Sequence, residues 1–239
     1  MHGAPAVHQI GATGSIHQPR GVLLSSIVVQ LLTPASIEPA ARLLAGSMRD
    51  NPLHRRLFAG DAARIEPFLG AAFGRLLQRQ MVTGLVPGAF RGETLVGVAA
   101  MVPPGHCQPT LQEKLAMLAI LARGRGLRHL PRIQRWLKIW ARQDPDLDHW
   151  HLGPAAVERT LQGQGIGSLL MTAICDELDR RQANGYLETD KHRNVRLYQR
   201  GGFEVVAEQP VLGVPNWFML RRPAAAASRA GYTSAPTFA

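Results

Sequence analysis

The chain has 239 residues, 46% of them apolar, which is enough for one domain with a substantial core. No basic segment precedes an apolar run in the first 20 residues, and the apolar run 22–32 is about half a membrane span, so we expect a cytoplasmic protein without signal peptide or membrane anchor. Two cysteines, Cys107 and Cys175, show no disulfide or zinc spacing. The formal charge of +10 is compatible with binding to nucleic acid, to a membrane surface or to an anionic cofactor.

Both ends of the chain lack periodicity, so we expect flexible segments over 1–20 and 223–239 around one domain over 21–222. The domain is predicted to begin with a strand over 22–32 and a helix over 34–48, which Thr33 would cap. A second helix over 61–79 would begin at Asp61. Two runs over 84–90 and 94–102, joined by a tight turn, predict an antiparallel hairpin.

A long helical stretch over 110–142 follows, within an insert over 105–142. Its second half places apolar side chains on one face and basic side chains around the rest. The basic face has two interpretations, a solvated outer surface or a docking surface for an anion, lipid or nucleic acid. The apolar set is Leu130, Ile133, Trp136, Leu137 and Trp140, and the basic set is Arg128, Arg132, Arg135, Lys138 and Arg142.

The last third of the chain alternates between the two kinds of element. Strands are predicted over 150–157, 185–189, 203–207 and 217–221, and helices over 165–182 and 194–200. Alternation of this kind indicates an α/β or α+β protein built around one mixed sheet.

Residues 155–168 are the most informative segment, a strand, a turn and a helix whose first residues are glycines. A helix start exposes unpaired N–H groups and the positive end of the helix dipole, and glycine lets a phosphate approach the backbone closely, so the segment predicts a pyrophosphate site. A P-loop would need a lysine after Gly165 or Gly167, and a dinucleotide fingerprint would need a different glycine spacing. Both templates are excluded.

The pattern Gln162-x-x-Gly165-x-Gly167 resembles instead the coenzyme A motif of the GNAT superfamily of acyl-CoA N-acyltransferases. The segments 187–189, 193–195, 197–200 and 202–205 follow in the order and spacing of that superfamily. Segments 149–154 and 217–222 are most similar to the branch that includes puromycin N-acetyltransferase. The match is close over about 149–222 and thin before it.

The resemblance implies a single GNAT-like domain, with a mixed central sheet splayed at the cofactor strand and helices on both faces. It implies transfer of an acetyl group from acetyl-CoA to a primary amine of a small molecule, by direct attack and without a metal. The acceptor is expected against residues from about 48 to 142, with the insert 105–142 shaping its pocket. The positions that match cofactor contacts are Ala155, Ala156, Val157, Gln162, Gly163, Gln164, Gly165, Ile166, Gly167, Ser168 and Asn194.

Two residues match catalytic positions of the superfamily. Tyr198 corresponds to the general acid that protonates the coenzyme A thiolate, although an aromatic on a short helix can also simply pack. Glu188 corresponds to the base of some members, although a carboxylate there can also orient water or neutralise an arginine. Glu158 is a second candidate base, a water chain is a third, and His151 is a candidate proton shuttle. Asn194 can equally be the N-cap of its helix.

The sequence indicates no metal site, because His149, His151 and His192 have no evident third carboxylate or cysteine ligand nearby. We expect a small-molecule amine as partner, no membrane and no nucleic acid, and the sequence leaves a homodimer open. A rival interpretation is a basic regulator that keeps the fold and binds nucleic acid or another ligand without catalysis. The arginine-rich 123–142 region motivates it, and the lack of a helix-turn-helix or base-stacking pattern opposes it.

Overall fold

The computed structural model describes residues 26–59, 62–123 and 126–224. The expected flexible segment 1–20, most of the expected tail 223–239 and the capping residue Asp61 lie outside these ranges. The strands are β1 (Ile27–Leu31), β2 (Pro87–Arg91), β3 (Thr94–Val102), β4 (His149–Val157), β5 (Asn184–Thr189), β6 (Glu204–Glu208) and β7 (Trp217–Arg221). The α-helices are α1 (Ile37–Met48), α2 (Pro52–Leu57), α3 (Ala62–Thr83), α4 (Leu111–Arg123), α5 (Leu130–Gln143), α6 (Ile166–Arg180) and α7 (His192–Arg200).

The strands form one mixed seven-stranded sheet in the order β1-β2-β3-β4-β5-β7-β6. The β4–β5 pair is parallel, whereas the other neighbouring pairs are antiparallel. The predicted hairpin is β2–β3, and α6 is the crossover between the two parallel strands, as a parallel pair requires. The predicted α/β architecture around one mixed sheet is confirmed.

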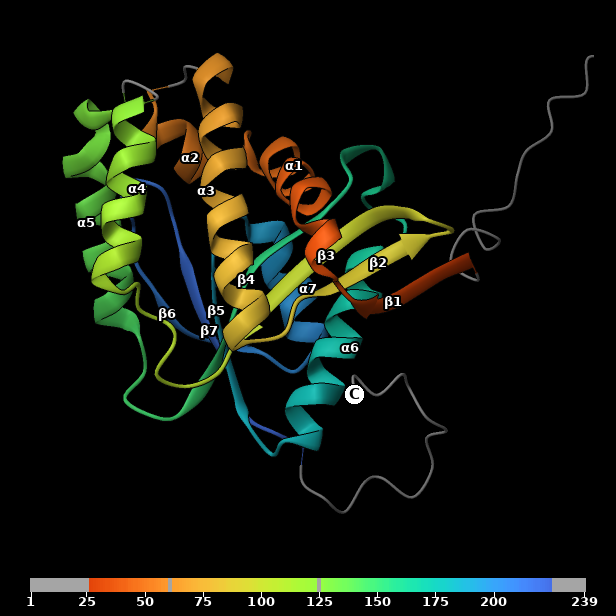
Figure 1. The fold of residues 1–239 in the computed structure, drawn as a ribbon. Helices are drawn as coiled ribbons and strands as arrows, with labels where there is room; N and C mark the ends of the chain where they lie inside the picture. The colour runs from red at the N-terminus through yellow and green to blue at the C-terminus, as the bar shows by residue number, and fades with distance from the viewer. Residues whose placement is uncertain (1–25, 60–61, 124–125, 225–239) are drawn as a thin grey trace, which may run out of the picture.

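Helices cover both faces of this sheet (Figure 1): α1 and α3 lie on one face with α4 and α5 beside them, and α6 and α7 lie on the other. The alternation of side chains along β3 explains this layering, because successive strand residues point to opposite faces. Val98 and Ala100 belong to the core under α1 and α3, whereas Ala99 and Met101 belong to the core under α6. A strand buried on both faces therefore reads as a continuous apolar run.

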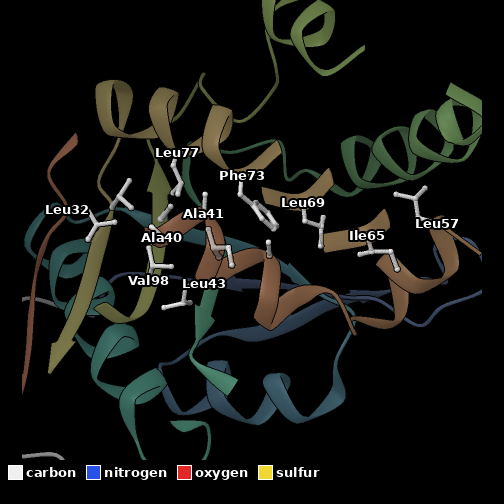
Figure 2. Packing of buried hydrophobic residues seen from close by; sticks show 14 of the residues in the cluster. Leu32, Ala40, Ala41, Leu43, Leu57, Ile65, Leu69, Phe73, Leu77 and Val98 are labelled. Atoms are coloured by element: carbon white, nitrogen blue, oxygen red, sulfur yellow. The ribbon is translucent and has the colours of Figure 1, made fainter. Parts of the chain in front are cut away.

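Small residues bring α1 and α3 close together in the first of these cores (Figure 2). A Cβ added at Gly70 or Gly74 of α3 would lie 4.0 or 3.9 Å from the Cβ of Ala45 or Ala41 on α1. Alanine and glycine repeat here at a spacing of four residues on both helices, which places them on facing sides. The two helices thereby form a firm layer over the strands that carry the candidate site.

Three expectations need correction. The helical stretch 110–142 is two helices, α4 and α5, with a 3-10 turn over Leu127–His129 before the second. The short helix α2 was not predicted, because six residues after Pro52 are too few to show a period. Leu137 does not share the inward face of α5, since it is 46% exposed, and the basic side chains predicted around that helix are exposed too.

The cap of α7 also differs from the expectation. Lys191 is its N-cap, and Asn194 lies three residues later, where its backbone N–H donates to the Lys191 carbonyl.

None of the helices in the described ranges is long and apolar enough to cross a membrane.

Candidate active site

Strands β4 and β5 separate partway along their length. They pair only where His149 to His151 face Asn184 to Tyr186, although β4 continues to Val157 and β5 continues to Thr189. The far half of β4 remains paired with β3 on its other side, through Ala155, Ala156 and Val157. Its second edge therefore carries backbone groups that no described strand pairs with, and an extended amide chain can add there as a further strand.

The glycine loop follows directly from this edge. Gly163 and Gly165 have φ angles of 79° and 87°, and Gly165 is the N-cap of α6. Such left-handed backbone suits glycine, and it turns the chain so that the first N–H groups of α6 point out of the helix end. The Ile166 side chain is buried in the core, so this residue offers only its backbone to a ligand.

Side chains hold the glycine loop in place. Gln162 donates from Nε2 to the Val157 carbonyl at 3.1 Å and accepts from Arg193 at 3.0 Å. Gln164 donates to the Thr160 carbonyl at 3.3 Å. Gln162 therefore fixes the loop to β4 and α7, Gln164 fixes it to the preceding 3-10 turn, and Arg193 brings a positive charge beside the helix start.

A cleft of about 680 Å³ adjoins this loop. Segments distant in sequence line it, namely the α1–α2 junction, the turn after β4, the start of α7 and the β6–β7 loop. It contains positive charge from Arg159, Lys191 and Arg193 and negative charge from Asp50 and Asp190. The full lining is Ser47, Asp50, Pro52, Arg159, Gln162, Asp190, Lys191, His192, Arg193, Val214, Pro215 and Trp217.

The two acidic groups of the cleft are held differently. Asp50 pairs with Arg159 and lies 3.8 Å from Arg49. Asp190 accepts from the Leu53 backbone N–H at 2.8 Å, which ties the end of β5 to α2. The sequence contains Asp190 directly after a predicted strand, a common position for functional side chains, and this signal was missed.

Tyr198 and Asn194 lie on α7, on the α6 side of the sheet. The Tyr198 ring packs near Phe203, with 6.2 Å between ring centroids, and borders the core that contains Leu187. Burial of the hydroxyl, with a smaller contribution from Asp190, raises the pKa of Tyr198 to about 12. Asn194 donates from Nδ2 to Thr189 Oγ1 at 3.4 Å, so it links α7 to the end of β5.

Glu188 lies on the opposite face. It alternates with Leu187 along β5, and its side chain is only 4% exposed. Glu188 Oε2 lies 3.0 Å from Nε2 of His151, which is on the same face of β4. Tyr198 and Glu188 therefore stand on the two sides of the opening between the strands. Glu158, the second candidate base, accepts a hydrogen bond from the Arg159 N–H and caps a short 3-10 turn.

The three histidines do not gather as one group. His192 packs against Trp217 at the cleft, whereas His149 and His151 meet Cys107, and the possible ligand atoms of these three residues lie within 4.8 Å of one another. The sequence showed no third ligand for the histidine pair, and the structure supplies one 42 residues upstream. We name Cys107, Asp144, His149 and His151 the Cys107 cluster.

Charge balance explains the protonation of this cluster. Burial raises the pKa of the Cys107 thiol, but contacts with His149 and His151 outweigh it and lower the pKa to about 7. Burial lowers the pKa of His151, but the charge of Glu188 and the contact with Cys107 outweigh it and raise the pKa to about 10. The acidic groups and the imidazoles therefore stabilise each other's charged forms.

A splayed parallel pair with a glycine-rich helix start at its open end defines an acyl-CoA N-acyltransferase. The model of the acetyltransferase (GNAT) family matches residues 61–203, and the chain belongs to this family, whose members use acetyl-CoA. The match covers the glycine loop, Glu188, Asn194 and Tyr198.

Solved structures share the fold at low identity. The histone acetyltransferase HPA2 and related acetyltransferase from Corynebacterium glutamicum is 20% identical, with a TM-score of 0.58 over 84% of this chain and 99% of that one. An Aedes aegypti protein assigned as arylalkylamine N-acetyltransferase 7 is 14% identical, with a TM-score of 0.58 over 82% and 87%. An agmatine N-acetyltransferase is 15% identical, with a TM-score of 0.50 over 82% and 99%.

Proposed function

We propose that this enzyme transfers the acetyl group of acetyl-CoA to a primary amine of a small molecule by direct attack. The observation that carries the proposal is the cleft of about 680 Å³ beyond the ends of β4 and β5, beside the glycine loop. A cavity of this size is typical of small-molecule sites. It also joins anionic and cationic groups, which suits a phosphorylated cofactor and an amine together.

The cofactor half of the proposal follows from backbone groups. The unpaired edge over Ala155, Ala156 and Val157 would pair with the pantetheine amides as an added strand. The N–H groups at the start of α6, from Gly163 to Ser168, would hold the pyrophosphate. Gln162 and Gln164 keep the loop in shape, and Asn194 would contact the pantetheine arm near the end of β5.

The chemical half follows from the two faces of the sheet. An amine attacks a thioester only as the neutral base, so a proton must leave it on the side from which it approaches. Glu188, held by His151, stands on one face and would take that proton. Tyr198 stands on the other face and, with its raised pKa, remains a proton donor for the departing thiolate.

The acceptor class follows from the acidic side chains of the cleft. Asp50 and Asp190 place carboxylates where a free ammonium group can pair before it loses its proton. Two structures of the same fold carry the names of amine acetyltransferases, for arylalkylamines and for agmatine. No described residue of the insert 105–142 lines the cleft, so a role of that insert in acceptor binding stays a prediction.

The test is release of free coenzyme A thiol from acetyl-CoA in the presence of a panel of amines. The panel should contain aromatic amines, aliphatic diamines, an aminonucleoside and a peptide with a free N-terminus. We expect saturable, amine-dependent release with at least one small amine. Release with the peptide alone would refute the small-molecule acceptor, and no release with any amine would refute the proposed reaction.

A further inference from the structure

The Cys107 cluster joins both ends of the α4–α5 insert to strand β4. Cys107 precedes α4, Asp144 directly follows α5, and His149 and His151 lie on β4. Cys107 Sγ is 3.6 Å from His149 Nε2, and Asp144 Oδ1 is 3.1 Å from the same nitrogen. Four groups that bind metals in proteins thus meet from three separate segments.

Hydrogen bonds determine which ring nitrogen each histidine presents. His149 Nδ1 lies 2.8 Å from the Leu147 carbonyl, which can only accept, so Nδ1 carries a hydrogen and Nε2 is the nitrogen that faces Cys107. His151 Nε2 lies 3.0 Å from Glu188 Oε2, which leaves Nδ1 on the other side of the ring. Histidine ligands of metals usually donate their second N–H to a carbonyl or carboxylate in this way.

Two atoms of the cluster are buried without a hydrogen bond. Among the described residues, His151 Nδ1 and Asp144 Oδ1 accept or donate no hydrogen bond. Asp144 Oδ1 is 3.1 Å from His149 Nε2 and yet is not hydrogen-bonded to it. With metal–nitrogen distances of about 2.0 Å and metal–sulfur distances of about 2.3 Å, adjacent ligand atoms of a tetrahedral ion stand roughly 3.3 to 3.8 Å apart. The cluster approaches this spacing.

We propose that Cys107 Sγ, Asp144 Oδ1, His149 Nε2 and His151 Nδ1 bind one Zn²⁺ ion, which fastens both ends of the α4–α5 insert to β4. Thiolate, imidazole and carboxylate together suit zinc, whereas magnesium and calcium prefer oxygen ligands alone. The possible ligand atoms of the cysteine and the two histidines lie within 4.8 Å of one another, so shifts of about 1 Å would bring them to tetrahedral spacing.

The site does not overlap the cleft, although its ligand His151 also contacts the proposed base Glu188. It lies where β4 and β5 are still paired, and the cleft at the open end shares no lining residue with it. A cavity of about 150 Å³, lined in part by Cys107, Asp144 and His149, gives an ion a path to the cluster. The ion therefore acts on the fold, as a clamp at the base of the insert.

The experiment is a titration of reduced, tag-free, metal-depleted full-length protein with Co²⁺, whose tetrahedral thiolate complexes absorb in the visible and near ultraviolet. Zn²⁺ is then added in competition. We expect one equivalent of Co²⁺ with a thiolate charge-transfer band, displaced by Zn²⁺. Cys107→Ser should remove the band and weaken binding at least about 100-fold. Cys175→Ser is the matched control, because it removes the only other thiol, which lies in the α6 core.

Hydrogen exchange over 103–148 provides a second measurement that does not depend on activity. Zn²⁺ should slow exchange at both ends of the insert in the wild type and in Cys175→Ser, but not in Cys107→Ser. Absence of the charge-transfer band, or binding that Cys107→Ser leaves intact, would overturn the proposal, as would exchange that Zn²⁺ leaves unchanged. The amine assay measures acetyl transfer separately, so a failure of zinc binding leaves the proposed function standing.

Discussion

Replacing Tyr198 by Phe should lower kcat about 10- to 1,000-fold, which corresponds to roughly 1.4 to 4 kcal/mol of transition-state stabilisation. The ring packs near Phe203 and borders the core beneath α6 and α7. The substitution removes only the hydroxyl oxygen, so it leaves that packing intact. The KM for acetyl-CoA should change little, because a proton donor acts on the departing sulfur in the transition state. Free thiol release at saturating acetyl-CoA measures the effect.

Tyr186→Phe is the matched control, because it removes the same atom from the fully buried tyrosine of β5. The Tyr186 hydroxyl donates to the Gln143 carbonyl at 2.7 Å, so its loss should lower the free energy of unfolding by about 1 to 2 kcal/mol. We expect this variant to lose stability in urea denaturation while its KM for acetyl-CoA is unchanged. Equal kcat values for wild type and Tyr198→Phe would refute the assignment of Tyr198 as the acid.

Gly163→Ala should raise the KM for acetyl-CoA about tenfold, because a side chain on left-handed backbone distorts the phosphate loop. Gly92→Ala in the β2–β3 turn is the control: it introduces similar strain (φ 58°) and should leave the KM unchanged. Equal KM values for the two variants would contradict the loop's role. The pKa of Tyr198 is raised to about 12, so this residue should stay protonated throughout the assay range and cause no fall in kcat. A fall of kcat above about pH 9 that Tyr198→Phe abolishes would contradict this expectation. Asp179→Asn should lower the free energy of unfolding by about 3 kcal/mol, since it breaks a largely buried bidentate pair with Arg221 at 2.8 Å; an unchanged urea midpoint would refute this value.

Local signals in the sequence were sufficient to predict the strand, turn and helix that carry the proposed cofactor site. The signals for β4, the glycine loop and α6 lie in consecutive residues of the chain. The segment 155–168 could therefore be interpreted without knowledge of the fold. The same holds for the antiparallel hairpin and the mixed sheet, which follow from the alternation of elements. Asn194 shows the limit of such signals, because a residue type that favours caps lies three residues inside α7.

Features that depend on distant pairs could not be predicted. The cleft requires Asp50 beside Arg159 and Asp190 beside Leu53, and each pair is more than 100 residues apart in the chain. The Cys107 cluster requires a loop before α4 to meet β4, and a lone cysteine in a sequence carries no sign of that meeting. No period or motif encodes such contacts, because packing of the whole sheet and its helices creates them.

A calorimetric titration with coenzyme A, paired with one using duplex DNA, tests directly whether this chain binds the acetyltransferase cofactor. We expect one coenzyme A bound per chain with micromolar to submillimolar affinity, weakened in Gly163→Ala but not in Gly92→Ala. We also expect no DNA binding at physiological salt. Absence of coenzyme A binding at millimolar levels, together with DNA binding that weakens steeply with salt, would contradict the acetyltransferase assignment and favour a regulator that keeps the fold without the reaction.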